Sequence, residues 1–260
     1  MSILVFLLIS NSAVAEPFDH CKQHLPLGTP EVRKAADTTP VCHDGYALLH
    51  DDKMLVPRWV AYRVTGEHTL GCVKRTDNFH ADETLPANKR ARPTDYLSSG
   101  YDQGHQAPAQ DFAWNIDRMK DSFSMANMAP QKPGLNRAQW LRLEETVRVW
   151  ATDRKALVVY VGPILLNAKR RIGERKVVIP TAFWKVVVDP DKGDALAFVL
   201  PQQSIAKGRL EPWQSSIDDI EQAAGITLPL PASVDREDKP KLWPADMRVW
   251  NKKHKVACGR

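Results

Sequence analysis

The sequence lacks long apolar stretches, internal repeats and linkers. Beyond its first residues, the 260-residue chain has no run of about 18 apolar residues, which excludes a transmembrane helix and predicts a soluble mature protein. It has no internal repeat and no low-complexity tract, which excludes a repeat architecture and gives no sign of disorder. Because no long Pro, Gly or Ser linker divides the chain, we expect a single domain over residues 16–260.

The N-terminus lacks the positive charge that usually opens a signal peptide. Residues 3–9 form an apolar run too short to span a bilayer, and the small-x-small pattern Ala13-Val14-Ala15 follows it. No Lys or Arg precedes the run, a departure that an upstream start or a trimmed leader would explain. We still predict a signal peptide over residues 1–15 and a periplasmic or secreted protein.

Cysteine is scarce, with four residues in the whole chain. An even number in an exported protein predicts two disulfides, and four cysteines allow three pairings. We favour Cys21 with Cys42, which closes a local loop, and Cys72 with Cys258, which ties down the C-terminal tail. The alternative is a zinc site, in which two adjacent ligands would make a tetrahedral geometry awkward; its ligands would be Cys21, His24, Cys42 and His43.

The charge balance is positive. The formal net charge is +5 at pH 7 and the isoelectric point is near 9.0, which permits a polyanionic partner such as nucleic acid. Basic clusters at residues 89–92, 169–171 and 175–176 are candidates to extend a binding surface. Ordinary solvated loops are an equally good interpretation of these clusters.

The hydrophobic pattern predicts strands and helices without a regular βαβ alternation. Segments rich in Val, Ile, Trp and Tyr and bounded by turns predict four strands, at residues 55–64, 157–163, 177–188 and 195–200. Pro and Gly between the last two predict a hairpin connection and antiparallel pairing. One helix is predicted from Asn136 to about residue 152, and another from Ser215 or Ser216 to Gly225. The pattern indicates an α+β fold.

Two segments carry side chains suited to catalysis. His105 lies within SGYDQGHQAPAQDF, residues 99–112, where no regular secondary structure is favoured. Imidazole is well suited to take a proton from water near neutral pH, although a lone loop histidine is more often solvated or structural. On the predicted helix, Asn136, Glu144 and Arg148 are spaced so that their polar heads reach one cleft. The plainer alternative is that Asn136 caps the helix and Glu144 pairs with Arg148.

Together these segments resemble a known family. DQGHQAP, residues 102–108, and MANMAPQKPGLNRAQWLRLE, residues 125–144, resemble the active-site region of the DNA/RNA non-specific endonucleases, the ββα-metal nucleases that include endonuclease G. That family carries Asp-Arg-Gly-His, then Asn-x-x-Pro-Gln, then Leu-Asn, and a Glu eight residues after that Asn, and the spacings match. The resemblance covers roughly residues 40–225 and implies a ββα-metal nuclease fold, a central and mainly antiparallel sheet flanked by helices.

The resemblance implies a role for each matching residue. His105 corresponds to the general base, Asn136 to the single protein ligand of Mg²⁺, and Glu144 to the acid that orients water on the metal. Magnesium keeps much of its water shell, so one amide oxygen is a reasonable sole direct ligand.

Four further positions match the family, and one departs from it. The matches are Arg75 and Arg148 to arginines that face the cleaved phosphate, Asn127 to a supporting amide, and Asp102 to the start of the motif. Gln103 stands where the family usually has Arg. We therefore expect the chemistry to persist with a changed phosphate affinity or rate.

The implied function is an exported, Mg²⁺-dependent endonuclease, with Mn²⁺ as a substitute, that cleaves DNA and RNA and leaves 5′-phosphate ends. Recognition through the phosphate backbone predicts little sequence or sugar specificity. A homodimer and an inhibitor protein are further partners that the resemblance leaves open. Two alternatives are a weakly active or inactive nucleic-acid-binding or uptake protein on the same scaffold, and a metal-dependent phosphodiesterase for another polyanion or a small ester.

Overall fold

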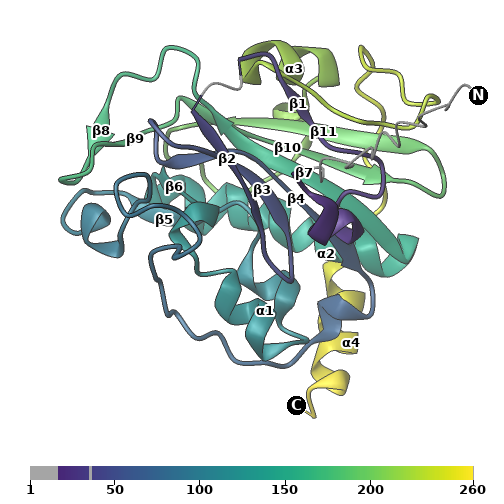
Figure 1. Ribbon diagram of the computed structural model, residues 1–260. Coiled ribbons are helices and arrows are strands. Elements are labelled where there is room, and N and C mark those ends of the chain that lie inside the picture. Colours follow the sequence, from purple (N-terminus) through teal and green to yellow (C-terminus); the bar gives the residue numbers. More distant parts are fainter. Residues whose placement is uncertain (1–16, 35–36, 260) are drawn as a thin grey trace, which may run out of the picture.

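A six-stranded antiparallel sheet runs through the centre of the molecule (Figure 1). The computed structural model describes residues 17–34 and 37–259, so the predicted leader at residues 1–15 lies outside the described residues. The sheet confirms the α+β prediction. In spatial order its strands are β11 (Asp194–Pro201), β10 (Ala182–Asp189), β7 (Ala156–Ile164), β4 (Val56–Thr65), β3 (Ala47–Asp51) and β2 (Thr38–Cys42).

Three of the four strand predictions are confirmed by β4, β7 and β11. The prediction of one strand over residues 177–188 is wrong, because the chain forms the short β9 (Val177–Val178) and then β10. Pro180 lies between them and has no N–H to donate to a ladder. The predicted hairpin is present, since β10 and β11 pair antiparallel up to Asp189 opposite Asp194.

The sheet is covered on both faces. Alternate residues of β7 point to opposite sides: Val159 packs in the cluster that includes helix α2 (Leu141–Arg154), and Val158 packs in the cluster that includes α3 (Ile217–Ala224). This double burial explains why β7 is apolar along its whole length. The apolar stripe predicted for the first helix is buried as expected, through Trp140, Leu143, Val147 and Trp150.

Both predicted helices are present, with one difference at the start of the first. Residues Leu135–Trp140 form a π-helical turn that runs directly into α2. Helix α3 begins where its signals indicate, because the Ser216 hydroxyl accepts the Asp219 N–H at 3.1 Å and Gly225 ends the helix with a left-handed φ of 67°. A wide π turn is a frequent feature of functional sites, and here it contains Asn136.

Shorter elements complete the fold. The pair β5 (Asp102–His105) and β6 (Met128–Gln131) lies beside the central sheet, together with α1 (Ile116–Asp121) and α4 (Met247–Ala257). Two further pairs are β1 (Glu31–Val32) with β12 (Ile226–Thr227), and β8 (Arg171–Ile172) with β9. Single 3₁₀ turns lie at Asp19–His24, His68–Leu70, Pro93–Tyr96, Ala109–Phe112, Met125–Asn127 and Glu211–Trp213. Within the described residues, none of the helices is long and apolar enough to cross a membrane.

The four cysteines form the two favoured disulfides, Cys21–Cys42 and Cys72–Cys258. The zinc alternative is wrong, because the sulfurs of Cys21 and Cys42 are bonded to each other. The two bridges indicate that the protein folds in an oxidising compartment.

Reduction of the disulfides should lower the melting temperature. Cys72 and Cys258 are 186 residues apart, and the chain-entropy relation gives about 5 kcal/mol for closing a loop of that length. For a domain of this size we expect a decrease of roughly 10 °C or more in dithiothreitol, measured by circular dichroism. A Cys72→Ser/Cys258→Ser variant should reproduce most of the shift. An unchanged melting temperature in both experiments would contradict this stabilising role.

Candidate active site

His105 stands at the end of β5, which pairs with β6. Its sequence context predicted a loop, and that prediction is wrong because pairing with a segment more than twenty residues away makes residues 102–105 a strand. Gly104 permits the pairing, since a Cβ there would lie 2.6 Å from the Gln131 Cβ. The strand therefore places His105 with more precision than a loop would.

Asn127 fixes the backbone beyond His105. Its side-chain oxygen accepts the Ala107 N–H at 2.9 Å, and its amide nitrogen donates to the carbonyl oxygens of Ala107 and Ser122, each at 2.8 Å. Asn127 is fully buried behind the strand pair. The predicted supporting amide thus holds the backbone and does not line a cleft.

The His105 imidazole is 7 % exposed and is packed edge-on against two rings, Phe79 with centroids 5.6 Å apart and Phe123 at 5.0 Å. Burial, and then the positive charge of Arg75, lower the pKa of His105 to about 3. Its Nε2 atom has no hydrogen-bond partner among the described residues. The ring is therefore neutral at physiological pH, with one buried nitrogen still uncommitted.

The Asn136 amide is oriented by Asp102. Asn136 Nδ2 donates to Asp102 Oδ2 at 2.9 Å, and this leaves the amide oxygen of Asn136 as the free end. Arg137 holds the same carboxylate with two bonds, from Nε at 2.9 Å and from an Nη at 2.6 Å. The alternative that Asn136 caps the helix is wrong, because Asn136 lies inside the π turn and its side chain donates to Asp102 on strand β5.

Glu144 belongs to a group of buried charges at the cleft. Burial raises the pKa of Glu144 to about 7, against the opposing charges of Lys185 and Arg148. Arg148 pairs with Asp111 at 2.9 Å, so the alternative of a Glu144–Arg148 pair is wrong. Lys185, on β10, is fully buried with its Nζ 4.8 Å from the centre of the Trp140 ring.

The predicted residues converge on one cleft of about 870 Å³. Arg75 enters it from the irregular segment after Cys72, with its guanidinium carbon 4.8 Å from the Phe123 ring centre and its Nε bonded to Asp77 at 2.5 Å. Six of the seven predicted site residues line the cleft, Asn127 being the exception. The six are Arg75, Asp102, His105, Asn136, Glu144 and Arg148.

The comparisons with known proteins decide the family. A sequence profile described as "DNA/RNA non-specific endonuclease" matches residues 26–234. The chain belongs to this family. It is a nuclease, and the family implies a divalent metal cation. Among its relatives, a nuclease of Nostoc sp. is 32 % identical over 218 residues, or 78 % of each chain. The mitochondrial endonuclease G of Bos taurus is 31 % identical over 196 residues, 70 % of this chain and 66 % of the relative.

A solved structure supports the same assignment for the nuclease. The crystal structure of the EndoG/EndoGI complex matches with a TM-score of 0.73 and 28 % identity, over 84 % of this chain and 93 % of the other. This match confirms the ββα-metal nuclease fold predicted from the sequence.

The nuclease's cleft fits a hard divalent cation. The free amide oxygen of Asn136 and the carboxylate of Glu144 are oxygen donors of the kind that Mg²⁺ prefers. Among the described residues there is no group of three or more His, Cys, Asp or Glu side chains that could hold a metal. A cation in this cleft would therefore have few protein ligands and would keep much of its water.

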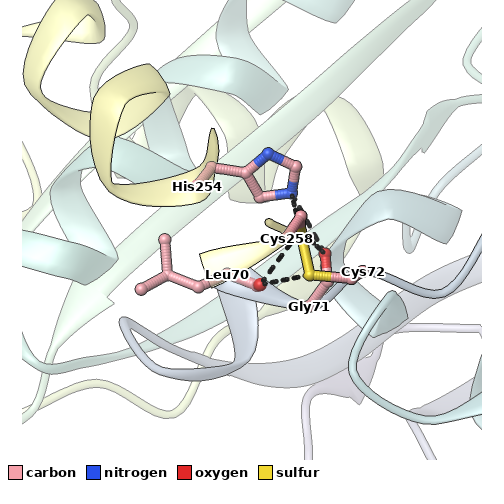
Figure 2. The surroundings of a disulfide bond; sticks show 5 residues. All are labelled: Leu70, Gly71, Cys72, His254 and Cys258. Atoms are coloured by element: carbon pink, nitrogen blue, oxygen red, sulfur yellow. Dashed lines mark hydrogen bonds between the residues drawn. A yellow bond between two sulfur atoms is a disulfide. The ribbon is translucent and has the colours of Figure 1, made fainter. Parts of the chain in front are cut away.

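The nuclease's C-terminal helix α4 forms one wall of the cleft, which was not predicted from the sequence. Trp250 and His254 line the cleft and stack on each other with centroids 5.0 Å apart. His254 Nε2 bonds to the Gly71 carbonyl oxygen at 3.0 Å, and Cys258 is joined to Cys72 (Figure 2). The helix is thus fastened to the segment that leads to Arg75.

The basic clusters singled out in the sequence lie away from the cleft lining. Lys89 pairs with Asp52 at 2.8 Å and Arg90 with Glu83 at 2.7 Å. Arg175 donates to the Ala87 carbonyl oxygen. These contacts link loops within the chain. Arg137 and Lys185 were missed, the first although it directly follows Asn136 and the second because it lies in an apolar strand.

Proposed function

We propose that this nuclease hydrolyses phosphodiester bonds in both DNA and RNA, with Mg²⁺ as its metal, and leaves 5′-phosphate ends. The observation that carries the proposal is the convergence of His105, Asn136 and Glu144 with arginine side chains in one cleft. A base, oxygen ligands for a cation and fixed positive charge are the components that this reaction requires.

His105 is the proposed general base. Its neutral ring offers the uncommitted Nε2 to a water that attacks phosphorus. An anionic phosphate in the cleft would offset the charge of Arg75. This would raise the pKa of His105 from its low value and strengthen His105 as a base.

Asn136 and Glu144 are the proposed metal-binding groups, with Asn136 as the direct ligand and Glu144 acting through water. When bound, Mg²⁺ or its substitute Mn²⁺ supplies charge neutralisation at the phosphate and at the departing 3′ oxygen. Asp102 holds the Asn136 oxygen toward the cleft, and Arg137 holds Asp102.

Arg75 and Arg148 are the proposed cationic contacts to phosphate. Arg75 is half exposed at the cleft, and Arg148 adds positive charge from the group of buried charges while it holds Asp111. Arg137 lines the same cleft as Gln103, which stands where the family usually has Arg, and its guanidinium adds a further positive charge there. These guanidinium groups are proposed to contact phosphate, and contacts to phosphate carry no sequence information, so little sequence or sugar preference is expected.

We also propose that residues 1–15 are an export signal, that residues 16–260 form one nuclease domain, and that the protein is periplasmic or secreted. The two disulfides support an oxidising destination. A nuclease of broad specificity needs control within a cell, and a similar structure was solved in an EndoG/EndoGI complex that addresses EndoG inhibition. An inhibitor protein is accordingly a proposed partner.

The proposal is tested with end-labelled DNA and RNA of the same sequence, incubated with Mg²⁺, Mn²⁺ or EDTA. We expect cleavage of both polymers with either metal, no cleavage in EDTA, and product ends that are 5′-phosphorylated. Retardation of both polymers on a gel without cleavage would instead support the nucleic-acid-binding alternative.

The pH dependence of the reaction should follow Glu144. Its carboxylate form is the one that helps to hold the cation, and burial raises its pKa to about 7, so kcat/KM at low Mg²⁺ should fall as the pH drops below about 7. His105 stays neutral far below that pH. Glu144→Gln should remove this acid limb and reduce activity at pH 8 by about 10- to 100-fold. An acid limb that persists in Glu144→Gln would assign it to another group.

A further inference from the structure

Helix α4 carries a row of basic side chains beside the catalytic cleft. Residues Met247–Ala257 include no Asp or Glu. Successive residues of an α-helix are about 100° apart, so Arg248, Lys252 and Lys255 share one side of α4. We call these three side chains the basic row.

Asn251 joins the basic row to the cleft. It lines the catalytic cleft together with Trp250 and His254, and it also lines a shallower hollow together with the basic row. The row therefore continues the surface on which His105 and Asn136 stand. The family profile ends at residue 234, so α4 lies beyond the matched part of the chain.

The helix is held in one place before any ligand binds. Trp250 donates from Nε1 to the Thr69 hydroxyl at 3.2 Å, and the Arg148 guanidinium carbon lies 5.8 Å from the Trp250 ring centre. The disulfide to Cys72 fastens the other end. A fixed row loses little conformational entropy when it binds a ligand.

The two lysines of the row have charge to offer. Arg248 is partly engaged, since it pairs with Asp246 at 3.1 Å. Lys252 and Lys255 are exposed, and no ion pair involves either of them within the described part of the chain. Their ammonium groups are therefore open to an anionic ligand.

We propose that the basic row binds the phosphate backbone of the nucleic-acid substrate, away from the phosphate that is cleaved. The proposal rests on the proposed function. From Arg248 to Lys255 the row spans about 10 Å of helix, an axial length over which duplex DNA carries about six phosphates. A lysine contacts phosphate as a point charge, and such a contact carries no sequence information, in keeping with a broad substrate range.

The test compares two variants of the oxidised full chain. Lys252→Ala/Lys255→Ala removes two charges of the row, and Lys253→Ala is the control because Lys253 is exposed on α4 but lines neither hollow. The affinity for a duplex of about 30 base pairs is measured by fluorescence anisotropy in EDTA, between about 50 and 200 mM salt. Melting temperatures verify that both variants fold.

In the double variant we expect a dissociation constant about tenfold higher at the upper salt concentration and a log–log salt slope smaller by about 1.8, or 0.9 per lost contact. The Lys253→Ala protein should remain within about twofold of the wild type, because its side chain faces away from the row. If the double variant has the same dissociation constant and the same salt slope as Lys253→Ala, the proposal is overturned. This holds even if the wild type cleaves nucleic acid normally. If the wild type binds with the predicted salt slope but cleaves nothing, the basic row would still be supported as a binding surface and the proposed catalytic function would be contradicted.

Discussion

Replacement of His105 by alanine should reduce kcat on DNA and RNA by about 10³-fold, because general-base catalysis contributes roughly 10² to 10⁴. The ring is the cleft's one buried imidazole with an uncommitted nitrogen among the described residues, so no neighbouring histidine stands ready to replace it. His254 also lines the cleft, but its Nε2 is bonded to the Gly71 carbonyl oxygen. The measurement is single-turnover cleavage of a labelled duplex at saturating Mg²⁺.

The matched control is His20→Ala, which removes an exposed histidine outside the cleft. We expect its rate to equal that of the wild type. His105 packs between two phenylalanine rings, so a folded His105→Ala protein must be verified by its circular dichroism and melting temperature. A folded variant that keeps more than a tenth of the wild-type kcat would refute the assignment of His105 as base.

Replacement of Asn136 by alanine should lower kcat/KM more than 100-fold and raise the Mg²⁺ concentration needed for half-maximal rate. The substitution removes the amide oxygen proposed to bind the metal and leaves Asp102 with Arg137 as its remaining partner. The loss of Lewis-acid stabilisation is worth several kcal/mol. A Mg²⁺ titration of the initial rate measures both quantities.

Asn88→Ala serves as the control, since Asn88 is exposed and lies outside the cleft lining. An Asp102→Asn variant gives a second comparison, because it weakens the hold on the Asn136 amide without removing that amide. We expect a smaller loss, about tenfold, in the range typical of groups that orient metal ligands. If Asn136→Ala had the same Mg²⁺ requirement as the wild type, the metal site would lie elsewhere.

Local signals were sufficient for most of the sheet and for both main helices. Ser216 and Gly225 mark the ends of α3 through their own hydrogen bond and backbone conformation, so a short stretch of sequence contains the information. The strand break near Pro180 was missed by the prediction of one strand over residues 177–188, although proline cannot donate to the ladder. Strand β5 could not be predicted from local sequence, since it forms by pairing with β6.

The sequence predicted which residues share the cleft but not the contacts between them. The resemblance indicated His105, Asn136 and Glu144, and the structure brings them together. Helical spacing placed Arg148 next to Glu144, yet Asp111 from a distant 3₁₀ turn pairs with Arg148 instead. Lys185 is a charge in an apolar strand, and only the folded structure shows that this charge acts on the pKa of Glu144.

The wall that α4 adds to the cleft depends on the folded chain as a whole. The bridge between Cys72 and Cys258 was predicted as a way to tie down the tail, and it does so. Helix α4 lies at the cleft because the segment to which it is tied leads to Arg75. The periodicity of the sequence does not encode the position of that segment.

We propose that one cleft, with His105 as base, cleaves both kinds of nucleic acid with the help of a divalent cation. In the most direct test, oxidised wild-type protein and the His105→Ala variant are each incubated with supercoiled plasmid and with structured RNA, in Mg²⁺ or in EDTA, and degradation of each polymer is measured. We expect the wild type to degrade both polymers in Mg²⁺ only and the variant to leave both nearly intact. Equal degradation by the folded variant, or cleavage that persists in EDTA, would contradict this proposal.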